Sequence, residues 1–353
     1  APPSVHGISG NYWLDRETGA EVMMTDAGPI AAPTILARLA EAGVAVAAVT
    51  AKDKLRRVLG HGLAGPGLSG IAFSAERADT ARRDEHGIDA AEALGGRELP
   101  DPYSADLSLF VLDAGIDLVA TGGARVVYLS LSDYVQHAHA PGAPAADAFL
   151  AAVDERLGRF LDLGAVVAVT ADHGMSDLAC ADGRPNVLFL ADRLDGRFGA
   201  GRCRVICPIT DPFVRHHGAL GGFVRVHLAD PRDTEMVRDF VAALPGVRMA
   251  LTREEACRRF ELPPEREGDV AVVAAKGVAL GMHEGDHRLD QLAGARLRSH
   301  GGLSETPVPF VVSHRPDTVA LARARAGDIC NWDVFAFALG AAAEACDQRR
   351  AAE

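Results

Sequence analysis

The chain has 353 residues, enough for one large domain or two smaller ones. Its formal net charge is −12, from 36 basic and 48 acidic residues, which argues against nonspecific nucleic-acid binding and against docking on an acidic membrane surface. The sequence shows no leader pattern, no apolar run of membrane-spanning length and no Cys-x-x-Cys pair among its six cysteines, so we expect a cytoplasmic protein with reduced thiols.

Helical and strand patterns alternate through the first two-thirds of the chain. The strand candidates are continuous apolar runs such as VAVAAVT and RVVYLSL, which are typical of strands buried on both faces. Such strands, separated by helices, predict an α/β fold with a parallel central sheet and helices on both faces. The predicted helices are 33–42, 105–121 and 144–163, and the predicted strands are 44–50, 125–131 and 165–170.

The pattern changes after about residue 185, where short strands surround two helices and indicate a smaller α+β insertion. The predicted strands there are 186–190, 223–228 and 270–274, and the predicted helices are 233–244 and 253–260. The core pattern then returns with a strand at 309–313 and a helix at 332–345. We therefore expect a core formed by residues 1–184 and 298–353, with residues 185–297 inserted between them.

Two Asp–His pairs follow predicted core strands directly. Asp172 and His173 come after AVVAVT, and Asp133 and His137 come after RVVYLSL. Ligands bind at the carboxyl ends of the strands in an open parallel sheet, and a carboxylate with an imidazole can ligate one cation. Each pair alone also fits a helix cap or a strand-end turn, but two such pairs at two strand ends favour a metal site.

Weaker signals lie elsewhere in the chain. His300 stands in a glycine-rich loop and offers one further nitrogen donor, and Asn11 stands in a glycine-punctuated turn where its amide could bind a phosphoryl oxygen. Lys52 and Lys54 belong to the densest basic cluster of an acidic chain, just after a strand, and suit a carboxylate or phosphonate. Each also fits a purely structural interpretation without a functional role, namely a loop histidine, a turn asparagine or a solvated helix start.

A glycine-rich segment at 65–70, GPGLSG, matches the spacing of a dinucleotide-binding turn. It follows no predicted strand and opens no helix of a βαβ unit, so we interpret it as a loop.

The segments DYVQHAHAPG, VTADHGMSD and LRSHGG, in this order, resemble the metal-binding segments of the alkaline phosphatase superfamily. PPSVHGISGN resembles a segment of its nucleotide pyrophosphatase and phosphonoacetate hydrolase branches, and the lysine pair in TAKDKL is closest to the phosphonoacetate hydrolases. The resemblance runs from residue 1 to about residue 313. It implies an alkaline-phosphatase-like core in which the insertion at 185–297 is a cap.

The resemblance also implies roles for these residues. Two Zn²⁺ ions are expected, one bound by Asp133, His137 and His300 and the other by Asp172 and His173. Asn11 would hold a phosphoryl oxygen, and Lys52 and Lys54 would hold the substrate anion.

Members of this family also carry a threonine nucleophile and a further Asp ligand before the segment that matches the Asn11 turn. The resemblance places both upstream of Ala1, and Thr18, Thr25 and Thr34 do not match the nucleophile position. We therefore expect the chain to be a fragment, or the product of a misplaced start, that lacks turnover.

The implied activity is zinc-dependent hydrolysis of the C–P bond of phosphonoacetate, a small-molecule phosphonate, to acetate and phosphate. A pyrophosphatase or phosphodiesterase on the same scaffold is the alternative among enzymes, and a non-catalytic protein that binds a metal or an anion is the alternative outside them. A homodimer is left open by the sequence.

Overall fold

A three-stranded parallel sheet lies at the centre of the larger part of the molecule. The computed structural model describes residues 1–209, 220–292 and 295–352, with side chains up to residue 345 except that of residue 291. Strand β3 (Val46–Thr50) pairs on one side with β4 (Ile71–Ser74) and on the other with β5 (Val126–Ser130). Thr50 lies opposite both Ser74 and Ser130, so the three strands end at the same level.

Helices cover both faces of this sheet, as the sequence predicts. Ala47 and Val49 of β3 pack against α6 (Asp106–Ala120), which supplies residues such as Leu107 and Val111 to the same core cluster. The alternate residues Val46 and Ala48 point to the opposite face, where they join Leu36 of α2 (Ile35–Glu41) and Phe335 of α13 (Val334–Ala352). Every residue of β3 is buried, because a strand in this position has both of its faces covered.

The third predicted core strand forms, but its pairing differs from the prediction. Strand β6 (Ala168–Thr170) pairs antiparallel with β15 (Phe310–Val312) in a separate two-stranded sheet. Leu129 of β5 and Val167 beside β6 nevertheless belong to one cluster with Phe160 of α8 (Pro144–Asp162), so the same helices cover both strands. Within the described part of the chain, β5 and β6 each have one hydrogen-bonded neighbour.

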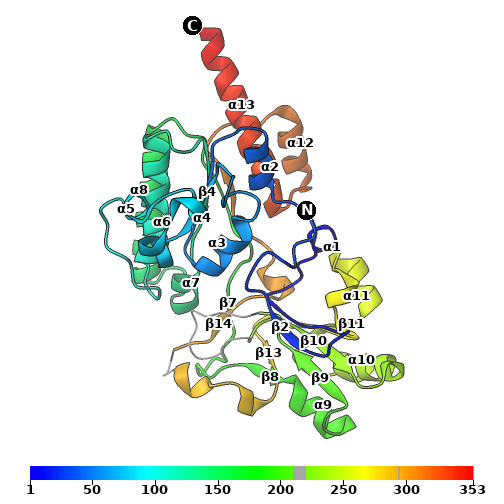
Figure 1. Cartoon of the computed structure of the whole chain (residues 1–353). Coiled ribbons are helices and arrows are strands. Elements are labelled where there is room, and N and C mark those ends of the chain that lie inside the picture. The colour runs from blue at the N-terminus through cyan, green and yellow to red at the C-terminus, as the bar shows by residue number, and fades with distance from the viewer. Residues whose placement is uncertain (210–219, 293–294, 353) are drawn as a thin grey trace.

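A four-stranded antiparallel sheet forms the centre of the smaller part, at the lower right in Figure 1. Its strand order is β11-β12-β10-β9, with bounds Val247–Thr252, Val270–Ala274, Phe223–Leu228 and Cys203–Ile206. Helices α9 (Leu190–Phe198) and α10 (Thr234–Ala242) pack their leucines and valines against the valines of this sheet. Strands β4, β9 and β11 and helix α9 are absent from our sequence prediction.

The N-terminal segment lies against the smaller part (Figure 1). It contains α1 (Pro3–His6) and the hairpin of β1 (Tyr12–Leu14) and β2 (Glu21–Met23). The buried guanidinium of Arg225 in β10 donates from Nη2 to the carbonyl oxygen of Ser9 at 2.8 Å and pairs with the buried carboxylate of Glu267. This contact joins two segments more than two hundred residues apart in the sequence.

The remaining helices and strands are at most nine residues long. They are α3 (Asp53–Leu59), α4 (Arg83–His86), α5 (Ala90–Leu94), α7 (Tyr134–Ala138), β7 (Ser176–Asp177), β8 (Val187–Phe189), α11 (Arg253–Phe260), β13 (Ala279–Gly281), β14 (Arg298–Ser299) and α12 (Thr318–Ala326), with single 3₁₀ turns between several of them. Helix α13 extends away from the body at its C-terminal end (Figure 1). Among the described helices, none combines the length and the apolar character that crossing a membrane requires.

Candidate metal centre

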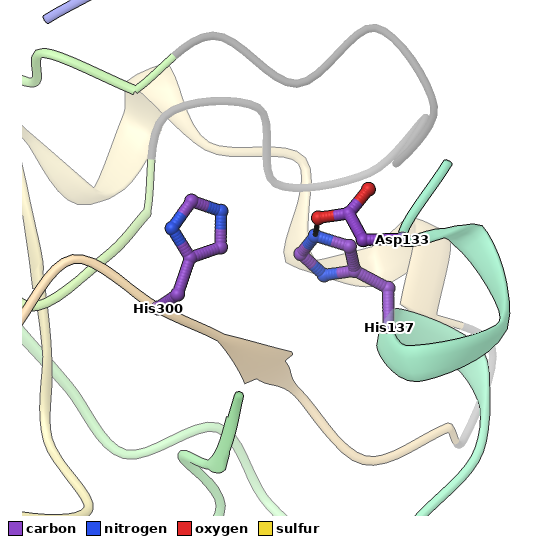
Figure 2. Close-up of side chains that lie close together, drawn as sticks. All are labelled: Asp133, His137 and His300. Carbon is purple, nitrogen blue, oxygen red and sulfur yellow. Dashed lines mark ion pairs between the residues drawn. The ribbon is translucent and has the colours of Figure 1, made fainter. Parts of the chain in front are cut away.

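Three of the five predicted metal ligands converge on one point. Asp133 precedes α7 and His137 lies in its last turn, so both project from the segment that follows β5. His300 follows β14 and approaches from the other side, as Figure 2 shows. The ligand atoms of these three residues all lie within 4.8 Å of one another.

The tautomer of His137 suits a metal ligand. Its Nδ1 lies 2.9 Å from the carbonyl oxygen of Arg298, and because a carbonyl only accepts hydrogen bonds, Nδ1 carries the proton. In the neutral ring the lone pair is then on Nε2, which lies 3.1 Å from Oδ2 of Asp133. A backbone or carboxylate partner on the second ring nitrogen is the usual support of a metal-binding histidine.

The donor set fits a divalent cation. An imidazole lone pair that faces a carboxylate oxygen at 3.1 Å is stable only with a proton or a cation between them. Adding His300 gives one oxygen and two nitrogens, which is a donor set that zinc takes in proteins. His137 is buried and its two partners are half-buried, so the ion would be partly shielded from water.

Electrostatics around Asp133 keep its carboxyl group ionised. Burial acts to raise its pKa, but the neighbouring imidazoles of His137, His300 and His173 outweigh burial and lower the pKa below its ordinary value. The influence of His173 shows that the second Asp–His pair lies near the first.

The second Asp–His pair, Asp172 and His173, is more exposed to solvent than the first. The carbonyl oxygen of Gly174 lies 3.0 Å from Nδ1 of His173, so this ring too has its lone pair on Nε2, 3.6 Å from Oδ1 of Asp172. The Asp172 side chain is 87% exposed. The rings of His173 and His300 stack in parallel with centroids 3.5 Å apart. Asp172 and His173 thus stand beside the first group but do not form a three-ligand group of their own among the described residues.

Tyr128 of β5 lies within electrostatic reach of Asp172. Burial raises the pKa of its phenol, and the negative charge of Asp172 raises it further. The phenol therefore stays protonated at neutral pH and can act only as a neutral group beside the carboxylate.

The lysines stand at the same edge of the sheet as the cluster. Lys52 follows β3 by two residues, and β3 is the hydrogen-bonded neighbour of β5, which leads to Asp133. Its Nζ donates to the carbonyl oxygen of Pro102 at 3.2 Å and lies 3.5 Å from Oε1 of Glu76. Burial lowers the pKa of Lys54 from its ordinary value.

The Asn11 side chain is exposed, and its main chain is tied to the smaller part of the molecule. Its N–H donates to the carbonyl oxygen of Pro208 at 2.9 Å, and its carbonyl oxygen accepts from the N–H of Met24. These main-chain contacts hold the Asn11 turn in place and leave the role of its side-chain amide a prediction.

Sequence reasoning missed one residue of the centre, Arg298. Its carbonyl oxygen orients His137, and its side chain donates from Nε to the carbonyl oxygen of Gln136 at 2.8 Å. Each contact uses one main-chain carbonyl oxygen and joins residues about 160 positions apart, so no local sequence pattern signals either of them.

Comparison with known proteins accounts for this arrangement. Residues 1–302 match the type I phosphodiesterase / nucleotide pyrophosphatase family. The chain is 46% identical to phosphonoacetate hydrolase from Sinorhizobium meliloti 1021, over 97% of this chain and 82% of that one, with a TM-score of 0.88 to its complex with phosphonoformate and 0.87 to its complex with phosphonoacetate. The chain belongs to the phosphonoacetate hydrolase family. It is therefore an enzyme, a phosphoryl hydrolase of the alkaline phosphatase superfamily.

More distant members of the superfamily share the fold. Murine ectonucleotide pyrophosphatase / phosphodiesterase 5 is 17% identical over 89% of this chain and 74% of its own, with a TM-score of 0.55. Membership in this superfamily and the candidate ligand group together indicate a metal-dependent enzyme that acts on a small molecule.

Proposed function

We propose that this protein is a zinc-dependent hydrolase that cleaves the C–P bond of phosphonoacetate to give acetate and phosphate. The observation that carries the proposal is the 46% identity, over nearly the whole chain, to a phosphonoacetate hydrolase whose structure contains phosphonoacetate. The Asp133, His137 and His300 group supports the zinc requirement, because its donor set fits that ion.

Two cations are proposed, one held by Asp133, His137 and His300 and the other by Asp172 and His173. When bound, such a pair of ions stabilises the attacking and leaving groups of an in-line displacement at phosphorus. The chain's own contribution is to orient the donors, as the Arg298 carbonyl does for His137.

Cleavage of a C–P bond leaves an electron pair on carbon, which makes it harder than cleavage of a P–O bond. In phosphonoacetate the adjacent carboxylate spreads this charge into an enolate, and a proton then completes acetate while an oxygen nucleophile remains on phosphorus. We propose that Lys52 and Lys54 hold the carboxylate, because their positive charges would stabilise the enolate in a site partly closed to water. Asn11 is proposed to donate from its amide to a phosphoryl oxygen. None of the described residues is proposed as the nucleophile.

The family match favours one alternative, hydrolysis of a phosphodiester or pyrophosphate at the same cations. Both activities use the same metal ligands, so metal binding does not separate them. The lysine pair favours the phosphonate, since a diester offers no carboxylate for it to bind.

The test compares two substrates in one preparation. Purified full-length enzyme loaded with Zn²⁺ should release equal amounts of phosphate and acetate from phosphonoacetate, and a chelator should abolish this release. Faster turnover of bis(p-nitrophenyl) phosphate than of phosphonoacetate, at equal concentrations, would favour the alternative. No zinc-dependent release from either compound would refute both.

A further inference from the structure

Glu305 is a buried carboxylate that contacts both histidine loops of the candidate centre. Its side chain is 5% exposed, and it ends a short 3₁₀ turn, Leu303–Glu305. One carboxylate oxygen accepts from the hydroxyl of Ser176, and the other accepts from the N–H of Gly302 at 2.9 Å. Its own carbonyl oxygen accepts from the N–H of Gly174 at 2.6 Å.

These three donors belong to the segments that carry the ligands. Gly174 directly follows His173, and Gly302 lies two residues after His300. Ser176 of β7 pairs with Ser299 of β14, so the two segments already run side by side. Glu305 therefore adds side-chain and main-chain bonds across the pair of loops whose imidazoles stack 3.5 Å apart.

Both loops approach Glu305 closely at a glycine. A Cβ on Gly302 would lie 2.9 Å from Oε2 of Glu305, and a Cβ on Gly174 would lie 3.2 Å from its carbonyl oxygen and 3.1 Å from that of Pro307. Real Cβ atoms rarely come so close to other atoms, so a side chain at Gly174 would displace two backbone carbonyl groups, whereas one at Gly302 would displace the end of the Glu305 side chain.

We propose that Glu305 is a positioning residue that locks the His173 and His300 loops together, so that the two cation positions form as one unit. The inference rests on the proposed function, because it assigns His300 to one cation and His173 to the other. Partners that orient metal ligands without touching the metal typically change metal affinity by about 10–100-fold when removed.

The competing explanation is that Glu305 only stabilises its own turn by accepting from Gly302. Two neighbouring residues separate the explanations. Ser176→Ala removes the bond across the loops and leaves the turn intact. Thr306→Ala removes a bond inside the turn, in which Oγ1 of Thr306 donates to the carbonyl oxygen of Leu303 at 3.0 Å, and leaves the contact across the loops intact.

The experiment measures Zn²⁺ affinity and stoichiometry by competition with a chromophoric chelator, together with the visible spectrum of the Co²⁺ form. Glu305→Ala should weaken both cation positions together by about 10–100-fold. Ser176→Ala should weaken both by a smaller factor, and Thr306→Ala should bind like the wild type. Glu305→Gln should stay within about three-fold of the wild type, because its amide oxygen can accept from Gly302 and its amide nitrogen can donate to Ser176.

Several results would overturn the inference. Wild-type affinity in both Glu305→Ala and Ser176→Ala would show that the lock has no role, and loss confined to one cation position would show that the loops are not coupled. If Glu305→Gln were as weak as Glu305→Ala, the charge of the carboxylate would matter and not its hydrogen bonds. Should Glu305→Ala fail to fold by circular dichroism, Ser176→Ala decides. A wild-type protein that binds no zinc would instead contradict the proposed function.

Discussion

Replacing Glu267 by alanine should destabilise the protein strongly, although this residue lies outside the candidate centre. The Glu267 side chain is fully buried and Arg225 is 1% exposed. Nε and Nη2 of Arg225 donate to the two carboxylate oxygens at 2.8 and 2.6 Å. Removal of the carboxylate would leave a guanidinium buried without its counter-charge, at a cost of about 3–5 kcal/mol.

The loss of the Arg225–Glu267 ion pair should also loosen the contact between the N-terminal segment and the smaller part. Arg225 also donates to the carbonyl oxygen and hydroxyl of Ser9, so a displaced guanidinium would release this segment. Trp13 of β1 is buried under the guanidinium of Arg266, 4.8 Å from the ring centre, so we expect its fluorescence to change when this segment separates. Urea titration followed by tryptophan fluorescence and by circular dichroism gives the free energy of unfolding.

Two further variants provide the controls. Glu41→Ala breaks an exposed ion pair with Arg38 and should cost at most about 0.5 kcal/mol. The double variant Arg225→Met with Glu267→Leu removes both charges and should recover most of the stability that Glu267→Ala loses. A loss below about 1 kcal/mol in Glu267→Ala, or a double variant no more stable than it, would refute the reasoning.

Two other predictions follow from ionisable groups. Burial, with a smaller contribution from Arg16, lowers the pKa of His227 to about 4. In the unfolded chain this histidine binds its proton near pH 6.5, so protonation favours the unfolded state below that pH. The free energy of unfolding is therefore unaffected by His227 above about pH 6.5 and falls by about 3 kcal/mol as the pH drops toward 4. His227→Gln should flatten the pH dependence of the urea midpoint in this window, and an unchanged slope would contradict the assignment. Lys54→Ala in the full-length enzyme should raise the KM for phosphonoacetate about ten-fold or more, because the lysine would bind its carboxylate. The KM for a neutral aryl phosphate ester, which has no carboxylate, should change little. Equal changes in both KM values would mean that the lysine supports the fold instead.

The sequence predicts the elements that local pattern controls. Strands 223–228 and 270–274 and helix 253–260 match the structure residue for residue. FVRVHL and VAVVA are short runs rich in β-branched residues, and the helix begins at a Thr252 capping box. The sequence does not predict strand β4, because Ile71–Ser74 is only four residues long and follows a glycine-rich loop, and its pairing with β3 decides its structure. The antiparallel pairing of β6 with β15 cannot be predicted from local pattern either, since it joins segments about 140 residues apart.

The residues of the candidate centre also fall into those that a local sequence pattern predicts and those that it does not. Asp133 and His137 could be located because they follow a recognisable core strand, and the end of a parallel strand is where ligands bind. His300 stands in a glycine-rich loop, which alone is a weak signal, and the family resemblance is what assigns it to the metal site. Arg298 and Glu305 act through backbone groups and a serine hydroxyl, which any sequence supplies, so only coordinates reveal them.

The free edges of β5 and β6 have a consequence for how the chain behaves at high concentration. Among the described residues each strand offers one unpaired row of N–H and C=O groups, and neither VVYLS nor AVT contains the lysine or proline that commonly blocks such an edge. The net charge of −12 repels other copies at long range, but it does not protect a row of backbone groups once two chains meet. Because an unpaired strand edge can recruit a strand of another chain, we expect self-association at high concentration to begin at these two edges.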